Sequence, residues 1–172
     1  MGQPKALLDF AGQPLWKIQM EKLQALNPDE LFLSLPRDLL LPSGPWRVLH
    51  DEKAGLGPLS GLHSALQAMT SDWLIVLAID LPDMTTAFLQ DLYDTAQANR
   101  CGLVPQLDGF YESLAAVYPR SVAGLCGGHL ASDDRSLQRF TRQAMADGQL
   151  TLSPVTPLNR SLFRNVNSPE DV

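Results

Sequence analysis

Residues 73–82 read W-L-I-V-L-A-I-D-L-P and include the longest unbroken apolar stretch, on which the predicted fold depends. Seven apolar residues precede Asp80, with no polar residue among them. Such a run is typical of a strand covered on both faces, as in a parallel sheet, although a buried helix segment would also fit. The β-branched residues of the run, and Pro82 just beyond it, favour the strand. We therefore expect Asp80 at the carboxyl end of a central strand.

The position of Asp80 matters because ligands of open α/β sheets bind outside the carboxyl ends of the strands. A carboxylate there can hold a divalent cation that is shared with a phosphate group. The simpler interpretation is an aspartate that caps the turn before Pro82 and Asp83. The residues elsewhere in the chain distinguish a metal-binding carboxylate from a turn cap.

Strands and helices alternate through the first hundred residues, which is the signature of a doubly wound α/β sheet. We expect one three-layer α/β/α domain over residues 1–172, with a mostly parallel, Rossmann-like sheet. Residues 107–109 (L-D-G) predict a hairpin turn. Apolar periodicity predicts one helix after the loop 55–58 and others at 15–26, 86–99, 119–130 and 136–146. Further strands are predicted at 30–35, 46–49, 102–105, 112–118, 151–155 and 162–163.

Composition narrows the class of protein. The chain has 172 residues, of which 45% are hydrophobic and 19% charged, as in ordinary globular proteins. Its net charge of −6 argues against a non-specific nucleic-acid binder. Cys101 and Cys126 have neither disulfide-framework nor zinc-site spacing. No apolar run reaches the ~20 residues of a membrane span, and no signal-peptide pattern opens the chain, so we expect a cytoplasmic protein without a membrane partner.

Four features fall where such a sheet holds its ligands. Lys5 lies in an early loop, Asp51 follows a strand, and Asp80 ends the central strand. The segment G-P-L-S-G (57–61) opens a helix, where free N–H groups and the helix dipole can receive an anion. Each feature alone also has an ordinary explanation, as a solvated lysine, a cap or a packing glycine.

In this order the features resemble the molybdenum cofactor guanylyltransferases of the nucleotidyltransferase superfamily. The resemblance covers essentially the whole chain. Its first and last stretches, with G-P-L-S-G and D-L-P between them, form a fairly specific set. The matching stretches are M-G-Q-P-K-A-L-L (1–8), G-Q-P-L (12–15), G-P-L-S-G (57–61), A-I-D-L-P (78–82), E-S-L-A-A-V-Y (112–118), D-R-S-L (134–137) and F-R-N-V-N-S-P-E-D (163–171).

The resemblance implies transfer of GMP from GTP to the terminal phosphate of molybdopterin, with release of pyrophosphate. It implies Mg²⁺ as cofactor and GTP and the molybdopterin cofactor as partners, with other cofactor-biosynthesis or molybdoenzyme-maturation proteins as further partners. Lys5 and Asp80 match the catalytic pair, and Asp80 matches the magnesium ligand. Asn165 and Asn167 match asparagines near the metal and the pterin substrate. The matches to the nucleotide pocket are Lys5, Ser34, Asp51, Gly57, Pro58, Leu59, Gly61 and Asp80.

Two departures from the family pattern carry consequences. The family has a strand and a glycine-rich loop, L-A-G-G-x-S-x-R, just before the M-G-x-x-K segment at which this sequence starts. We therefore expect the first strand to be missing from the sheet, and we expect weak GTP binding because that loop cradles the triphosphate. Ser34 stands where the family often has an asparagine for the guanine or ribose, which affects base specificity.

Two other functions remain open at this stage. One is a cytidylyltransferase of the same cofactor, although the N-V-N-S-P and G-P-L-S-G segments favour the guanylyl enzyme. The other is a non-catalytic protein that binds or scaffolds the pterin cofactor after loss of the triphosphate loop.

Overall fold

The computed structural model describes residues 5–37, 39–50, 57–132, 135–167 and 171. The helices are α1 (Leu15–Gln24), α2 (Pro58–Ala68), α3 (Thr86–Asn99), α4 (Ala123–Ala131) and α5 (Leu137–Ala146), with 3₁₀ turns η1 (Lys5–Leu7), η2 (Arg120–Val122) and η3 (Arg160–Phe163). The strands are β1 (Asp9–Phe10), β2 (Gln13–Pro14), β3 (Phe32–Leu35), β4 (Arg47–His50), β5 (Trp73–Leu77), β6 (Gly102–Leu107), β7 (Phe110–Tyr111), β8 (Ala115–Pro119) and β9 (Leu150–Pro154).

The main sheet has five strands in the order β5-β8-β6-β7, with β9 on the other side of β6. Strand β8 is antiparallel to both β5 and β6, whereas β9 is parallel to β6. Strands β5, β6 and β9 therefore share one direction. Strands β3 and β4 form a separate parallel pair. The predicted α/β class is confirmed, but the main sheet is mixed rather than mostly parallel, because the β5–β8, β6–β8 and β6–β7 pairings are antiparallel and only the β6–β9 pairing is parallel.

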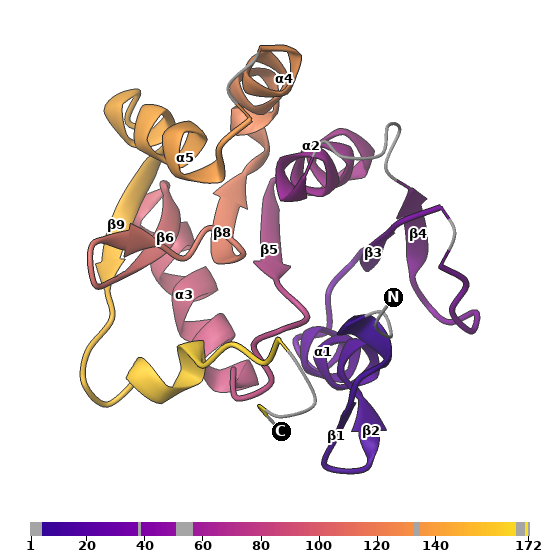
Figure 1. The fold of residues 1–172 in the computed structure, drawn as a ribbon. Coiled ribbons are helices and arrows are strands. Elements are labelled where there is room, and N and C mark those ends of the chain that lie inside the picture. Colours follow the sequence, from indigo (N-terminus) through magenta and orange to yellow (C-terminus); the bar gives the residue numbers. More distant parts are fainter. Residues whose placement is uncertain (1–4, 38, 51–56, 133–134, 168–170, 172) are drawn as a thin grey trace.

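Helices cover both faces of the main sheet, and alternate residues of the strands point to each (Figure 1). Leu74, Val76 and Tyr118 pack with α2, α4 and α5. Trp73 and Val117 pack with α3 on the opposite face. The apolar run of β5 is thus divided between two cores, as the absence of polar alternation predicted.

The space between β5 and β3 is the one large departure from a continuous sheet. In the described part of the chain, β5 pairs only with β8, and β3 pairs only with β4. A cavity of about 850 Å³, which we call the slot, lies between them and is lined by residues of α1, β3, α2, β5 and α3. All five residues of β5 remain partly exposed, because the slot runs along one edge of the strand.

Local signals were mostly confirmed. The hairpin turn joins β6 to β7, and Asp108 and Gly109 take φ values of 51° and 84°, the left-handed pair of a two-residue hairpin. The helix expected from residue 119 instead begins with η2 and continues as α4, because Pro119 still belongs to β8. The strand expected at 162–163 is wrong, since these residues lie in η3.

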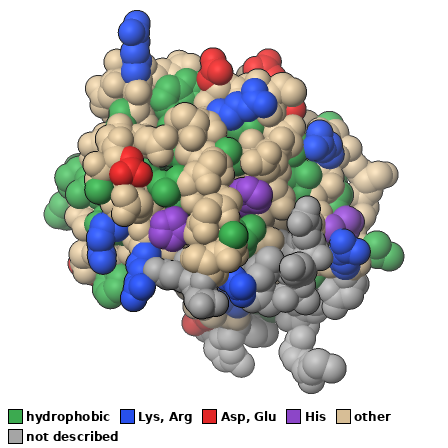
Figure 2. Space-filling model, turned by 90° about the horizontal axis from the view of Figure 1, so that it is seen from above, with side chains coloured by type: hydrophobic (Ala, Val, Ile, Leu, Met, Phe, Trp, Pro, Cys, Tyr) green, Lys and Arg blue, Asp and Glu red, His purple; other side chains and the backbone are tan. Residues whose placement is uncertain are grey.

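The surface gives no sign of a metal centre built on histidine. The histidines appear as separate purple patches rather than one cluster in Figure 2. Among the described residues, no three His, Cys, Asp or Glu side chains are grouped as metal ligands would be. No helix within the described ranges is both long and apolar enough to cross a membrane.

Candidate functional site

Asp80 lies just beyond the end of β5, in the turn that leads toward Pro82. The ladder with β8 ends at the pair Leu77–Ala115, and the N–H of Ala78 still donates to the carbonyl of Leu114 at 2.7 Å. The Asp80 side chain is 26% exposed and lines the slot. The carboxylate is therefore accessible at the carboxyl end of the strand, as predicted.

Lys5 and Asn167 meet beside Asp80, although they are separated by 162 positions in the sequence. The Lys5 Nζ donates to the Asn167 Oδ1 at 2.6 Å and lies 3.8 Å from the Asp80 Oδ2. All three groups retain some exposure to solvent. Three of the predicted site residues thus form one polar cluster, which we call the Lys5–Asp80–Asn167 cluster.

The backbone around Val166 holds the C-terminal segment against this cluster. Val166 is fully buried, and its N–H donates to the carbonyl of Asp80 at 2.8 Å. Asn165 and Asn167 flank it, and both side chains are exposed. The Asn167 N–H donates to the Asp171 carboxylate at 2.9 Å. The two predicted asparagines therefore flank the residue that bonds the Asp80 backbone, and Asn167 also bonds Lys5.

The G-P-L-S-G segment opens α2 on another wall of the slot. Gly57 is the N-cap with a φ of 71°, and Pro58 occupies the first helical position. A Cβ atom on Gly61 would lie 2.6 Å from the Ser34 Oγ, so glycine allows α2 and β3 to approach closely. Gly57, Pro58, Gly61 and Ser34 all line the slot.

Leu59 differs from the other residues of that segment. Its side chain is fully buried in the core under α2, and its carbonyl faces the Cys126 thiol at 3.9 Å. Only its backbone could therefore contribute to a nucleotide pocket. Asp51, the remaining predicted nucleotide residue, lies outside the described residues.

Glu112 is a neighbour of Asp80 that the sequence did not single out. Its side chain is half-buried, and burial, with the Asp80 charge as a second cause, raises its pKa. Glu112 begins the segment E-S-L-A-A-V-Y, which matches the family pattern, but the match assigned no role to Glu112 itself. Its spacing from Asp80 in the sequence gave no indication that two strands would bring the carboxyl groups together.

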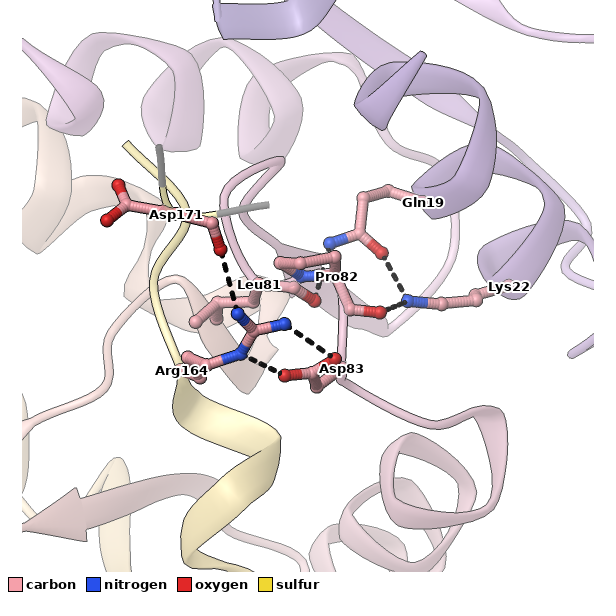
Figure 3. Close-up of polar contacts among 7 residues, drawn as sticks. All are labelled: Gln19, Lys22, Leu81, Pro82, Asp83, Arg164 and Asp171. Atoms are coloured by element: carbon pink, nitrogen blue, oxygen red, sulfur yellow. Dashed lines mark hydrogen bonds and ion pairs between the residues drawn. The ribbon is translucent and has the colours of Figure 1, made fainter. Parts of the chain in front are cut away.

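A network of polar contacts from α1 holds the turn after Asp80 (Figure 3). Gln19, which is only 2% exposed, donates to the carbonyls of Ala78 and Leu81. Lys22 donates to the carbonyl of Pro82, and burial lowers its pKa while the Asp83 charge opposes the shift. The sequence held a signal for Gln19, because it lies four residues after Leu15 and four before Leu23 on the apolar stripe of the helix.

The Asp83 side chain points away from α1 and toward the C-terminal segment. Arg164 Nε donates to it at 2.6 Å, and Arg164 Nη1 donates to the carbonyl of Asp171 at 2.9 Å. The guanidinium also lies over the ring of Phe10, 5.7 Å from its centroid. These contacts tie the segment that carries Asn165 and Asn167 to the turn that carries Asp80.

The donor groups fit a magnesium ion of the kind that is shared with a substrate. Mg²⁺ usually retains several waters and takes one or two carboxylates together with substrate phosphates. An accessible Asp80 carboxylate with Lys5 beside it suits such a shared ion better than a cage of protein ligands. Asp80 is thus the group that would hold the metal.

Comparison with known proteins identifies the family of this chain. Residues 1–148 match the family described as the MobA-like NTP transferase domain. The chain belongs to this family. It is accordingly a nucleotidyltransferase by class, and its resemblance to the molybdenum cofactor guanylyltransferases is confirmed.

Relatives within the family match almost the whole chain. A probable molybdenum cofactor guanylyltransferase of Opitutus terrae is 29% identical over 99% of this chain and 86% of its own length. A molybdenum cofactor guanylyltransferase of Pseudomonas putida is 26% identical over 98% of this chain and 86% of its own. These relatives thus include residues beyond the matched part.

Solved structures share the fold. The molybdopterin-guanine dinucleotide biosynthesis protein A of Archaeoglobus fulgidus has a TM-score of 0.78 and 22% identity, and the match covers 99% of this chain and 87% of that one. The 2-C-methyl-D-erythritol 4-phosphate cytidylyltransferase of Thermus thermophilus has a TM-score of 0.71 and 18% identity, over 99% and 91%. The nucleotidyltransferase fold is therefore confirmed, but at these identities the structures do not distinguish the base.

Proposed function

We propose that this chain transfers GMP from GTP to the terminal phosphate of the molybdopterin cofactor, with release of pyrophosphate. The observation that supports the proposal is the Lys5–Asp80–Asn167 cluster at the carboxyl end of β5. Its members come from the start, the middle and the end of the chain, and they meet where an α/β sheet binds its ligands. Relatives named as guanylyltransferases match nearly the whole chain.

Each residue has a role that its position supports. Transfer of a nucleotidyl group depends on positioning and charge neutralisation more than on covalent chemistry with the protein. Lys5 carries a cation to the edge of the slot and would stabilise charge on the pyrophosphate leaving group. Asp80 would hold Mg²⁺, which supplies neutralisation of the phosphate charges when bound. The acceptor phosphate is itself a nucleophile, so no strong general base is required.

The asparagines and the loop at α2 would orient the two substrates. Asn165 and Asn167 flank Val166, whose N–H bonds the Asp80 carbonyl, and their exposed amide groups would bind the pterin-side phosphate or the metal-bound substrate. Gly57, Pro58 and Gly61 border the slot opposite β5 and would form one wall of the nucleotide pocket. Ser34 packs against Gly61, so its hydroxyl is the group on β3 that would meet the base or ribose.

We also propose that a strand with a glycine-rich triphosphate loop, placed in the slot beside β5, would strengthen GTP binding, because the backbone N–H groups of such a loop cradle phosphates. The slot beside β5 supports this proposal, since a strand that carries such a loop would end next to Asp80. Cytidylyl transfer and non-catalytic binding of the pterin cofactor remain the alternative functions, and nucleotide binding separates them.

The test is isothermal calorimetry of GTP and CTP with Mg²⁺. Two chains are compared, this one and a version extended upstream by about 20 residues that carry an apolar strand and an L-A-G-G-x-S-x-R loop. We expect GTP to bind the extended version at least tenfold more tightly than this chain, because the loop would supply several charge-assisted hydrogen bonds. CTP should bind the extended version more weakly than GTP. Pyrophosphate release should require GTP and molybdopterin together.

Two variants locate the site. Asp80→Ala should abolish magnesium-dependent GTP binding in the extended version. Asp108→Ala removes an exposed carboxylate that pairs with Arg160 near the β6–β7 turn, and it should leave binding unchanged. Tighter binding of CTP than GTP would replace the guanylyl function with the cytidylyl one. Binding of molybdopterin without any nucleotide would favour the non-catalytic function.

A further inference from the structure

One glutamine bonds the backbone on both sides of Asp80. The Gln19 Nε2 donates to the carbonyl of Ala78 at 2.9 Å and to the carbonyl of Leu81 at 2.7 Å. Its Oε1 accepts from the Lys22 Nζ at 2.9 Å. Both amide protons are therefore used, and the bonds span the two residues, Ile79 and Asp80, that form the turn.

The orientation of this amide is fixed by its neighbours. Lys22 has only donors, so it must face the oxygen of the Gln19 amide, and the nitrogen must face the two carbonyls. Lys22 itself donates to the carbonyl of Pro82, the next residue of the turn. Gln19 is 2% exposed, so water is not available as a replacement donor. A buried carbonyl without a partner is costly, and this side chain satisfies two of them.

The hydrogen bonds of Gln19 lie just beyond the end of the β5–β8 ladder. Pairing of β5 with β8 ends at Leu77, so the carbonyls of residues 78 and 81 lie beyond the ladder. The carbonyl of Asp80, between them, accepts the N–H of Val166 at 2.8 Å. The turn that carries Asp80 is thus held from one side by α1 and from the other by the C-terminal segment. With the backbone fixed on both sides, the point from which the Asp80 side chain starts is also fixed, and its Oδ2 lies 3.8 Å from the Lys5 Nζ.

We propose that Gln19 is the positioning residue for Asp80: by holding the carbonyls of Ala78 and Leu81, it sets where the Asp80 carboxylate meets the metal. The part of this inference that concerns the metal rests on the proposed function. Gln19 touches no substrate in this role and acts only through the backbone. Groups that orient a metal ligand in this way typically change metal affinity by about 10–100-fold when they are removed.

The test uses Gln19→Met, which retains the shape of the side chain and removes both donors. The matched control is Gln138→Met. Gln138 is also a helical glutamine that bonds the backbone twice, donating to the carbonyl of Tyr111 at 2.7 Å and accepting from its N–H at 3.0 Å. It lies on α5 and bonds the backbone of β7 rather than the turn of Asp80. If Gln19→Met does not fold, Gln19→Glu replaces it, because the carboxylate retains the bond from Lys22 and has no N–H donor.

The first readout is hydrogen exchange of the Val166 amide, which reports the position of the Asp80 carbonyl in this chain without any ligand. After correction for the global stability of each variant, we expect Val166 to exchange at least about tenfold faster in Gln19→Met than in Gln138→Met. Equal exchange in the two variants would overturn the inference, since the turn would then hold its place without Gln19.

The second readout is the affinity for Mn²⁺ in the presence of GTP, measured by water-proton relaxation on the N-terminally extended chain with Asp80→Asn as reference. We expect Gln19→Met to weaken Mn²⁺ binding about tenfold and Gln138→Met to leave it unchanged. An unchanged affinity in Gln19→Met, with a clear loss in Asp80→Asn, would refute the positioning role. If Asp80→Asn also leaves Mn²⁺ binding intact, the proposed function fails, and the exchange of Val166 still decides whether Gln19 sets the turn.

Discussion

Strands β5 and β8 are hydrogen-bonded neighbours of equal length, yet they differ sharply in burial. Residues Ala115, Ala116, Val117 and Tyr118 of β8 are all 0% exposed. Every residue of β5 is partly exposed, although its sequence W-L-I-V-L contains larger apolar side chains. The difference follows from their partners, because β8 lies between β5 and β6, whereas β5 has the slot along its other edge.

The comparison shows that a strand's burial depends on its neighbours as well as on its own composition. The apolar pattern of β5 is suited to a central position with strands on both sides. Among the described residues it occupies an edge, where exposed apolar strands are a liability. The described structure therefore contains a continuous half, built on β8 and β6, and an open half between β5 and β3.

The largest expected effect comes from filling the slot. An upstream extension that carries an apolar strand should raise the free energy of unfolding by about 3 kcal/mol or more, because it would cover the partly exposed side chains of β5 and pair its free edge. Urea unfolding followed by circular dichroism measures the change, and the m-value should rise with the newly buried surface. The control is the same extension with prolines at alternate positions, which cannot complete a ladder. An extension that adds no stability would show that the slot does not accept a strand.

A matched pair of truncations should sharpen the comparison at single residues. Val117→Ala in β8 should cost about 2 kcal/mol, because two methyl groups leave a fully buried site and a cavity remains. Val76→Ala in β5 should cost about 1 kcal/mol, since its site is already partly open. Chemical denaturation of the two variants measures both values. Equal losses of stability in the two variants would contradict the view that side chains of β5 contribute less to stability than those of β8.

The smallest effect concerns a charge at the boundary of the two halves. Burial, with the Asp80 charge as a second cause, raises the pKa of Glu112 in the folded state, so its ionisation opposes folding. Below the pKa of the unfolded chain the carboxyl group is neutral in both states, and this cost is absent. As the pH rises through the unfolded and then the folded pKa, stability is lost. Glu112→Gln should therefore gain about 0.5 kcal/mol at neutral pH, a figure discounted for solvent screening of this half-exposed group.

The pH dependence itself distinguishes this cause from a packing effect. The stability difference between Glu112→Gln and the unsubstituted chain should be small at pH 4 and should grow toward pH 7, as thermal unfolding at each pH would show. A constant difference across this range would mean that the amide changes packing rather than charge.

The sequence predicted those parts of the fold that depend on local pattern. The helical stripe of α1, the alternation of strands and helices, and the Asp108-Gly109 turn all follow from short-range chemistry, and all are confirmed. The strand expected at 162–163 was wrong because a two-residue apolar run fits a 3₁₀ turn equally well. The partial exposure of β5 could not be read from its own residues, since it depends on the strand pairing at its other edge.

The site was predictable only as a set of residues. The family resemblance selected Lys5, Asp80 and Asn167, and the structure brings them together, but their roles remain proposals. Glu112 and Gln19 were missed because their part depends on side chains meeting across elements that are distant in sequence. For Gln19 the clue was a polar residue on an apolar helical stripe, which is uncommon unless its hydrogen bonds are satisfied.

The bond between Lys5 and Asn167 has a consequence for the order in which the protein folds. Its two residues are 162 positions apart in the sequence. The entropy cost of closing so long a loop has to be met before a contact between its ends contributes to stability. The helices and the β6–β7 hairpin need only short-range contacts, so we expect them to form before this bond. A folding chain with much of its secondary structure in place would therefore still lack the Lys5–Asp80–Asn167 cluster.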